Sequence, residues 1–192
     1  MVEAVTRKLC PLALLLALLA FPSAVFAHRD DQYLQATLVA IEPSGVRLQI
    51  NLTPGVAVAE QVLAEIDRDR DGAISKNEAA AYAESLKRDL TLLIDGRDLE
   101  LKLTACEFVP PEELRTGSGI IQMGFSAILD PLAAGPHRLT LENRHLTAIS
   151  VYLINAAPPR FAPVQITRQK RNQNQSAGEI EFYLSFIPPK DR

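Results

Sequence analysis

Strict alternation of apolar and polar side chains marks much of the chain and predicts β-strands. Residues 46–52 alternate without a break, which is typical of a strand with one buried face. The turn-forming tetrad Glu-Pro-Ser-Gly at 42–45 joins them to a similar run at 33–41, so we expect a hairpin. Shorter apolar runs separated by Pro and Gly predict further strands at 120–128, 138–142, 149–154, 164–167 and 180–186.

A second hairpin is predicted around Asp95-Gly96. Asp-Gly between two alternating runs, here 92–94 and 99–103, is a strong signal for a tight two-residue turn. Short strands at this even spacing, with turn residues between them, favour a mainly β fold. We therefore expect residues 28–192 to form a single exported domain, an antiparallel Ig-like β-sandwich.

Residues 54–90 break the strand pattern and have a helical period. Thr53 is a suitable N-cap and Pro54 suits the first helical position. A second helix is predicted to begin at Ser75, which together with Glu78 forms a capping-box sequence. Apolar residues at helical spacing give each helix one buried face: Ala59, Val62, Leu63 and Ile66, then Ala79, Tyr82, Ala83, Leu86 and Leu90. The sequence thus predicts a helix–loop–helix inserted into the sandwich.

The loop between these helices is Asp67-Arg-Asp-Arg-Asp-Gly-Ala-Ile-Ser-Lys-Asn-Glu78. It resembles the EF-hand family at all twelve loop positions. Calcium is a hard cation that takes six to eight oxygens at about 2.3–2.6 Å, and alternating carboxylates converge on it as the backbone winds around. The expected ligands are the side chains, directly or through water, of Asp67, Asp69, Asp71, Ser75 and Glu78, together with the carbonyl of Ala73. Gly72 allows the sharp turn that this path needs.

A single hand suggests a structural or low-affinity calcium site. No second Asp-x-Asp-x-Asp-Gly pattern follows, so Ile74 lacks the sister loop with which this position normally pairs. It is expected to pack against the sandwich, or alternatively to mediate dimerisation. Extracellular modules of this type bind calcium with dissociation constants of about 10⁻⁴–10⁻³ M. Magnesium is a weaker candidate because it prefers near-octahedral geometry and keeps its waters.

The first 27 residues are predicted to be a secretory signal peptide. Arg7 and Lys8 precede an apolar run at 11–21, and Val25-Phe26-Ala27 provides a cleavage site. An uncleaved membrane anchor is the alternative, since the apolar stretch approaches the length of a span. We expect cleavage after Ala27, a periplasmic or extracellular location, and no membrane span afterwards.

Composition and the absence of known motifs argue against several classes of function. The formal net charge is −3 and the pI about 5.7, which argues against a nucleic-acid partner. The one basic run, at 168–171, is expected in a solvated loop. Cleavage would leave Cys106 as the only cysteine, so no intrachain disulfide would form, and we expect it to be a buried small hydrophobe. No motif of a hydrolase, metalloprotease or nucleotide-binding enzyme is present, so we do not expect an enzyme.

An alternative function rests on His28, which cleavage would place at the N-terminus. A terminal histidine offers both its α-amine and its imidazole to one metal ion. With His137 or His145 it would resemble the copper-binding histidine brace of some exported β-sandwich proteins. The alternative prediction is therefore an accessory protein that binds copper or nickel.

Several segments are similar to the exported soluble domain that precedes HupE/UreJ-like membrane proteins. They are Ala27-His28 with Tyr33-Leu-Gln35, and the stretches at 51–55, 137–143 and 149–153. Those membrane proteins are linked to nickel or cobalt uptake. The resemblance implies an accessory or interaction module whose protein partner is a membrane metal-uptake component.

Overall fold

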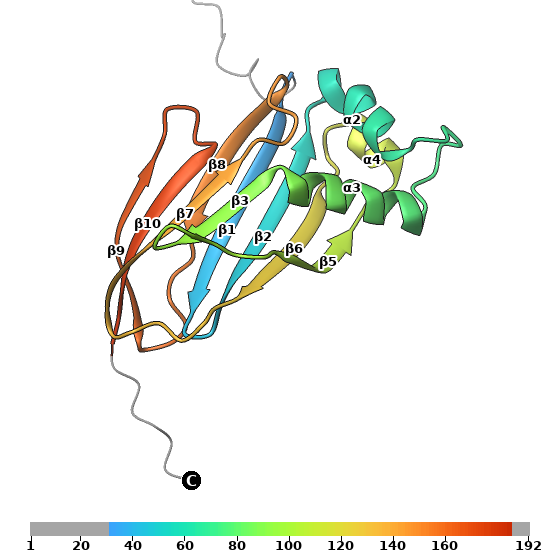
Figure 1. Ribbon diagram of the computed structural model, residues 1–192. Helices are drawn as coiled ribbons and strands as arrows, with labels where there is room; N and C mark the ends of the chain where they lie inside the picture. The colour runs from blue at the N-terminus through green and yellow to red at the C-terminus, as the bar shows by residue number, and fades with distance from the viewer. Residues whose placement is uncertain (1–30, 186–192) are drawn as a thin grey trace, which may run out of the picture.

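The computed structural model describes residues 31–185, which form two five-stranded sheets facing each other (Figure 1). The predicted signal peptide, His28 and Phe186 lie outside the described residues. Sheet A has the order β5-β6-β2-β1-β8, with bounds Lys102–Glu107, Ile121–Ile128, Gly45–Pro54, Tyr33–Glu42 and Ser150–Ala156. Sheet B has the order β4-β3-β7-β10-β9, with bounds Arg97–Asp98, Leu90–Ile94, Gly135–Asn143, Ala177–Leu184 and Val164–Arg171. The expected mainly β sandwich is confirmed.

The period-2 pattern explains why these strands pair as they do. In the β1–β2 hairpin, Val39 lies opposite Leu48 and Ile41 opposite Val46, and all four side chains are buried between the sheets. The remaining pairs are antiparallel too, except β1 and β8, which run parallel with Tyr33 opposite Ser150. Parallel strands require a long connection, and here more than a hundred residues separate the two partners.

The helices lie between β2 of sheet A and β3 of sheet B, where the sequence predicts the insertion. A 3₁₀ turn at Val56–Val58 leads into α2 (Ala59–Ile66), and the loop 67–75 leads into α3 (Lys76–Arg88). Helix α3 contacts β3 of sheet B and β5 of sheet A, and therefore lies across the side of the sandwich that these two strands form (Figure 1).

Apolar side chains fix α3 in that position. Tyr82, Ala83 and Leu86 follow the helical period and are buried in the common core. Ile74 is half-buried and packs against the same core, which matches the first of its two expected roles. Cys106 of β5 is only partly buried, so the expectation of a buried thiol is corrected; its Sγ lies 3.6 Å from the carbonyl oxygen of Ala79.

The first predicted helix begins later than expected. Thr53 and Pro54 are not its N-cap and first residue, because both still belong to β2, where Pro54 lies opposite Tyr33. Pro54 is buried as the last inward-facing residue of the strand, so burial outweighed its helix-start preference. A proline at a strand end removes no essential ladder hydrogen bond.

The second predicted hairpin is also shorter than expected. Asp95 and Gly96 form the predicted turn with φ values of 50° and 80°, but β4 contains only two residues. The chain leaves sheet B after Leu99, buries Leu101 in the core and enters sheet A as β5. The predicted strand at 99–103 is therefore not one strand: Leu99 still bonds to sheet B, and the residues from Lys102 onwards belong to sheet A. An unpredicted helix, α4 (Pro111–Arg115), follows and buries Leu114 completely.

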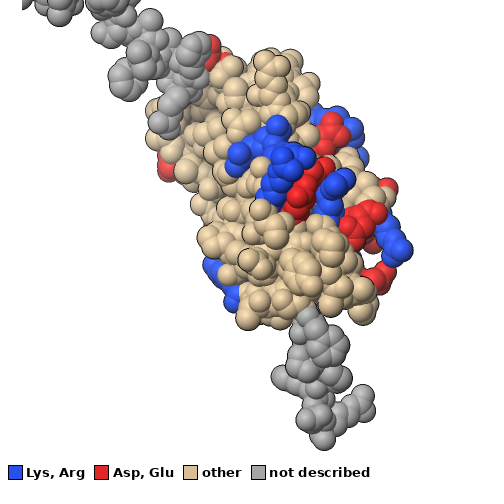
Figure 2. Space-filling view, turned by 90° about the vertical axis from the view of Figure 1, so that its left-hand side faces the viewer, with Lys and Arg blue, Asp and Glu red and all other residues tan. Residues whose placement is uncertain are grey.

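The basic run 168–171 belongs to β9 rather than to a loop, which corrects its expected place. Its charged side chains face solvent beside acidic residues of β10: Lys170 Nζ lies 3.6 Å from Glu179, and Arg138 of β7 lies 3.5 Å from the same carboxylate. Figure 2 shows this alternation of basic and acidic groups across the outer face of sheet B. Lys170 and Arg138 are thus paired with acidic side chains of the same sheet.

Within residues 31–185, no helix has both the length and the hydropathy needed to cross a bilayer.

Candidate metal centre

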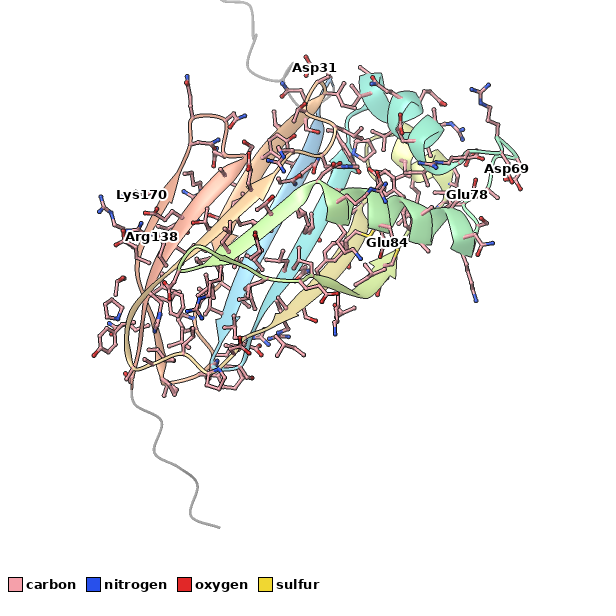
Figure 3. The ribbon with its side chains drawn as sticks, in the orientation of Figure 1. Asp31, Asp69, Glu78, Glu84, Arg138 and Lys170 are labelled. Atoms are coloured by element: carbon pink, nitrogen blue, oxygen red, sulfur yellow. The ribbon has the colours of Figure 1, made fainter. Side chains whose placement is uncertain are left out.

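The loop between α2 and α3 projects away from the sandwich, with Asp69 towards its tip and Glu78 at the start of α3 (Figure 3). Two left-handed residues shape it, Arg70 with φ 60° and Gly72 with φ 83°. Glycine adopts this conformation without the steric penalty that other residues incur, which explains Gly72 at the bend. The sharp turn predicted at this position is present.

The bend brings three carboxylates together. One oxygen from each of Asp67, Asp69 and Asp71 lies within 4.8 Å of the other two. Backbone N–H groups of the loop hold them: Asp67 accepts from Asp71 and Gly72 at 3.2 and 3.0 Å, and Asp71 accepts from Ala73 at 2.8 Å. The loop thus forms an oxygen-rich cluster, largely exposed to solvent, that can hold a metal ion.

The crowding of these carboxylates affects their protonation. The N–H of Asp71 donates to Asp69 and by itself lowers the pKa of that carboxyl. Desolvation and the negative charges of Asp71, Glu78 and Asp67 outweigh this, so the pKa of Asp69 lies above its ordinary value. A bound cation would relieve the same repulsion.

Glu78 and Ser75 occupy a capping box at the start of α3, as predicted. The Ser75 hydroxyl accepts from the Glu78 N–H at 3.2 Å, and the Glu78 carboxylate accepts from the Ser75 N–H at 3.0 Å. The other Glu78 oxygen accepts from the backbone of Arg68 at 2.8 Å, across the loop. Hydrogen bonds from Ser75, Arg68 and Asp69 hold the pKa of Glu78 below its usual value.

The structure therefore brings together only three of the six predicted ligand residues. Asp67, Asp69 and Asp71 meet in one cluster, whereas the Glu78 carboxylate is held against the backbone at its edge. The Ser75 hydroxyl is engaged in the cap, and Ala73 contributes an N–H to Asp71. On the α2 side, the guanidinium of Arg115 in α4 pairs with Glu60 of α2 at 2.7 Å. The positive charge of Arg115 is thus already paired with a residue outside the carboxylate cluster.

The two histidines of the described residues both have engaged ring nitrogens. In His137, Nδ1 lies 2.7 Å from Asp95 and Nε2 lies 2.8 Å from the carbonyl of Ala133. In His145, Nδ1 lies 2.7 Å from Asp89 and Nε2 lies 3.1 Å from the hydroxyl of Tyr82. Either residue would have to give up a hydrogen bond to join His28 at a transition metal.

His145 belongs to a buried polar cluster that sequence reasoning missed. Its carbonyl accepts from Tyr152 and from Gln35, and Asn143 bridges Gln35 to the His145 N–H. These residues come from β1, β7, β8 and the loop after β7. Gln35 is more than a hundred positions from its partners Asn143 and His145, so no local spacing links it to them. These hydrogen bonds hold the β7–β8 loop against the end of sheet A.

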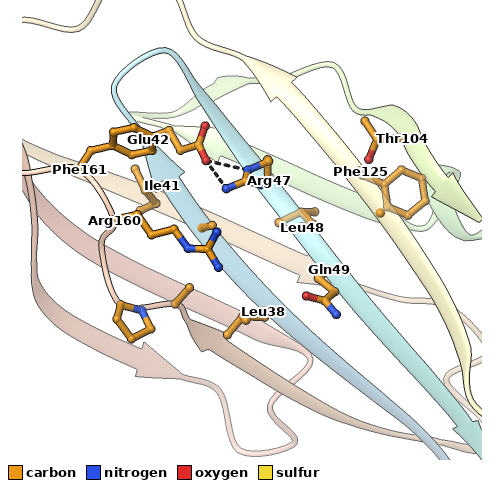
Figure 4. A pocket seen from close by; sticks show the side chains of 14 residues that line it. Leu38, Ile41, Glu42, Arg47, Leu48, Gln49, Thr104, Phe125, Arg160 and Phe161 are labelled. Atoms are coloured by element: carbon orange, nitrogen blue, oxygen red, sulfur yellow. Dashed lines mark hydrogen bonds and ion pairs between the residues drawn. The ribbon is translucent and has the colours of Figure 1, made fainter.

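A separate cavity of about 230 Å³ lies on the outer face of sheet A (Figure 4). Leu38 and Gln49 form part of its floor, and Arg160 and Phe161 overhang it from the loop after β8. Arg47 at its rim is paired with Glu42 at 2.7 Å. This cavity lies at the opposite end of β2 from the acidic loop and shares no residue with it.

Comparisons with protein-family models, with curated proteins and with solved structures found no match to this chain. The geometry of the loop itself is therefore what points to a function.

Proposed function

We propose that this protein binds one calcium ion in the loop 67–78. The observation that carries the proposal is the convergence of the Asp67, Asp69 and Asp71 carboxylates at alternating positions, with Glu78 beside them. Hard oxygen ligands from a flexible loop suit calcium, which accepts irregular coordination, better than magnesium. To supply both carboxylate oxygens, Glu78 would exchange the hydrogen bond that one oxygen accepts from the Arg68 N–H for the ion, and would share the other oxygen between the ion and the Ser75 cap.

The site is proposed to be structural or of low affinity. Helix α3 is fixed to the sandwich through Tyr82, Ala83 and Leu86, and Ile74 packs on the same core. A helix held on a rigid sheet cannot swing out as the helices of calcium sensors do. We expect the ion to order the loop without exposing a large apolar surface.

We further propose that the protein is exported by the segment 1–27 and acts as an accessory or interaction module rather than as an enzyme. Calcium in exported compartments can reach the concentrations that a weak site needs. A membrane metal-uptake component remains the proposed type of partner, on the resemblance of the segments named above.

Calorimetric titration with Ca²⁺ tests the function directly. We expect one ion per chain with a dissociation constant of about 10⁻⁴–10⁻³ M. Asp67→Asn and Glu78→Gln each remove a charged ligand while keeping size, and should abolish the heat of binding. Asp98→Asn removes one charge from an exposed residue of β4, outside the loop, and should bind like the parent.

Two results would contradict the proposal. One is the absence of binding heat together with a melting temperature that calcium does not change. The other is binding that survives both loop substitutions, which would place the ion elsewhere. Stoichiometric copper binding that is lost when the N-terminus is blocked would instead support the alternative site at His28.

A further inference from the structure

Four titratable side chains form one continuous hydrogen-bonded row between α3 and sheet A. Tyr33 Oη lies 2.7 Å from Tyr82 Oη, which lies 3.1 Å from His145 Nε2. His145 Nδ1 lies 2.7 Å from a carboxylate oxygen of Asp89. Both tyrosines and the histidine are buried, and only Asp89 at the end of α3 reaches solvent.

Only a neutral His145 satisfies every donor in this row. Nδ1–H then donates to Asp89, Nε2 accepts from the Tyr82 hydroxyl, and Tyr82 accepts from Tyr33. Burial raises the pKa of Tyr33 and of Tyr82 well above the ordinary value, so both hydroxyls keep their protons.

A second proton on His145 breaks this arrangement. Nε2–H must then donate to the Tyr82 oxygen, which turns the Tyr82 hydroxyl towards Tyr33. The Tyr33 oxygen has Tyr82 as its one partner within residues 31–185, so one hydroxyl hydrogen is left without an acceptor in the core. A buried polar group without a partner is costly, and the cost falls on the contact between α3 and the sandwich.

We propose that the row Tyr33–Tyr82–His145–Asp89 is a proton-sensitive latch, which holds α3 on the sandwich while His145 is neutral and weakens the calcium loop when His145 is protonated. The predicted weakening of calcium binding rests on the proposed function, whereas the hold on α3 does not. Helix α3 links the two sites, because Glu78 lies in its first turn, Tyr82 one turn later and Asp89 at its C-cap.

Charged and titratable groups face His145 from each of the helices, strands and loops that pack against it. Asp89 ends α3 and Glu65 lies on α2, and both favour the protonated ring. The tyrosines at 33, 82 and 152 belong to the same cluster and come from β1, α3 and β8, and Arg144 on the histidine's own loop is paired with Glu142. Burial dominates these effects and lowers the pKa of His145 below its usual value.

The stability that this row gives to the fold depends on pH. Since the folded protein disfavours protonation, the stabilisation by neutral His145 is complete above about pH 6.5, the ordinary histidine value. It is lost as the pH falls from there through the lowered pKa of the folded protein. The latch therefore weakens on acidification.

The test compares the parent with His145→Gln and His137→Gln at pH 7.5 and 5.5. The glutamine amide in the first variant can still donate to Asp89 and accept from Tyr82, but it cannot titrate. Urea denaturation with a chelator reports on the latch without calcium, and calorimetric titration with Ca²⁺ reports on the coupling. His137 lies outside the row and pairs with Asp95, so its variant is the matched control.

We expect the parent to lose urea stability at pH 5.5, and its calcium affinity to fall on the order of threefold to tenfold. His145→Gln should remove most of both effects beyond the loss caused by the loop carboxylates. His137→Gln should retain both, with a somewhat larger acid loss of stability, because it also removes the stabilisation that charged His137 supplies at low pH. An equal acid loss of stability in the parent and in His145→Gln would overturn the latch. A latch effect with unchanged calcium affinity would overturn the coupling alone. Absence of calcium binding at pH 7.5 would instead count against the proposed function, and the chelator arm would still decide the latch.

Discussion

The hydroxyl of Ser75 lies 2.8 Å from the carboxylate of Glu78, and each residue also caps the backbone N–H of the other. The last residue of the proposed calcium loop is therefore a helix cap as well. Its two tasks draw on the same carboxylate, so the stability of α3 and the binding of an ion are coupled through one side chain.

Replacing Ser75 with alanine should weaken α3. The substitution removes the acceptor for the Glu78 N–H, and loss of such a cap lowers the free energy of unfolding by about 1 kcal/mol. Urea denaturation in the presence of a chelator measures this. Ser85→Ala, in the last turn of the same helix, is the control and should be neutral or slightly stabilising, since alanine is the better helix former.

Removing one carboxylate from the cluster should have opposite effects without and with calcium. The pKa of Asp69 is raised in part because Asp71, Glu78 and Asp67 repel its charge, so Asp69→Asn relieves that repulsion. We expect a higher melting temperature than the parent in chelator and a lower one in millimolar calcium. A variant that melted above the parent in both conditions would argue against Asp69 as a ligand.

His137 should respond to pH in the sense opposite to His145. Burial alone would lower its pKa, but Asp95 and the carbonyl of Ala133 together raise it above the ordinary value. The stabilisation by charged His137 is therefore complete below about pH 6.5 and is lost as the pH rises through the raised value. NMR titration of the two rings should give a higher midpoint for His137, and Asp95→Asn should lower it.

Two glycine substitutions should differ in cost because their surroundings differ in rigidity. A Cβ on Gly119 would lie 2.8 Å from backbone atoms of Glu113 and Leu114 in α4. A Cβ on Gly178 would meet the Cγ2 of Ile154 at 2.9 Å, which a side-chain shift can relieve in part. We expect Gly119→Ala to lower the free energy of unfolding by about 1–3 kcal/mol and Gly178→Ala by less. Urea denaturation of both variants checks the order.

Local patterns in the sequence were enough for most of the strands and for the loop. The alternation at 46–52, the Asp-Gly turn and the Ser75–Glu78 cap each involve residues a few positions apart, and all three are present as predicted. The clustering of Asp67, Asp69 and Asp71 belongs to the same class, because one tight turn brings them together.

Long-range contacts decided what was missed. Pro54 stayed in β2 because its burial opposite Tyr33 outweighed its helix-start preference. The row from Tyr33 to His145 joins residues that are 49 and 63 positions apart, so no sequence window contains it. The run at 99–103 has a regular strand pattern, but only the packed core shows that the chain changes sheets within it.

The parallel pairing of β1 with β8 has a consequence for the order of folding. β1 lies inside sheet A, yet its second neighbour begins at Ser150. A chain emerging from the ribosome can close the β1–β2 hairpin at once, but the other edge of β1 stays unpaired until most of the protein has been made. Closing contacts over such a separation is slow, so we expect the pairing of β8 with β1 to be a late step of folding. Such a delay would be compatible with the proposed export, in which the chain would cross a membrane before sheet A is complete.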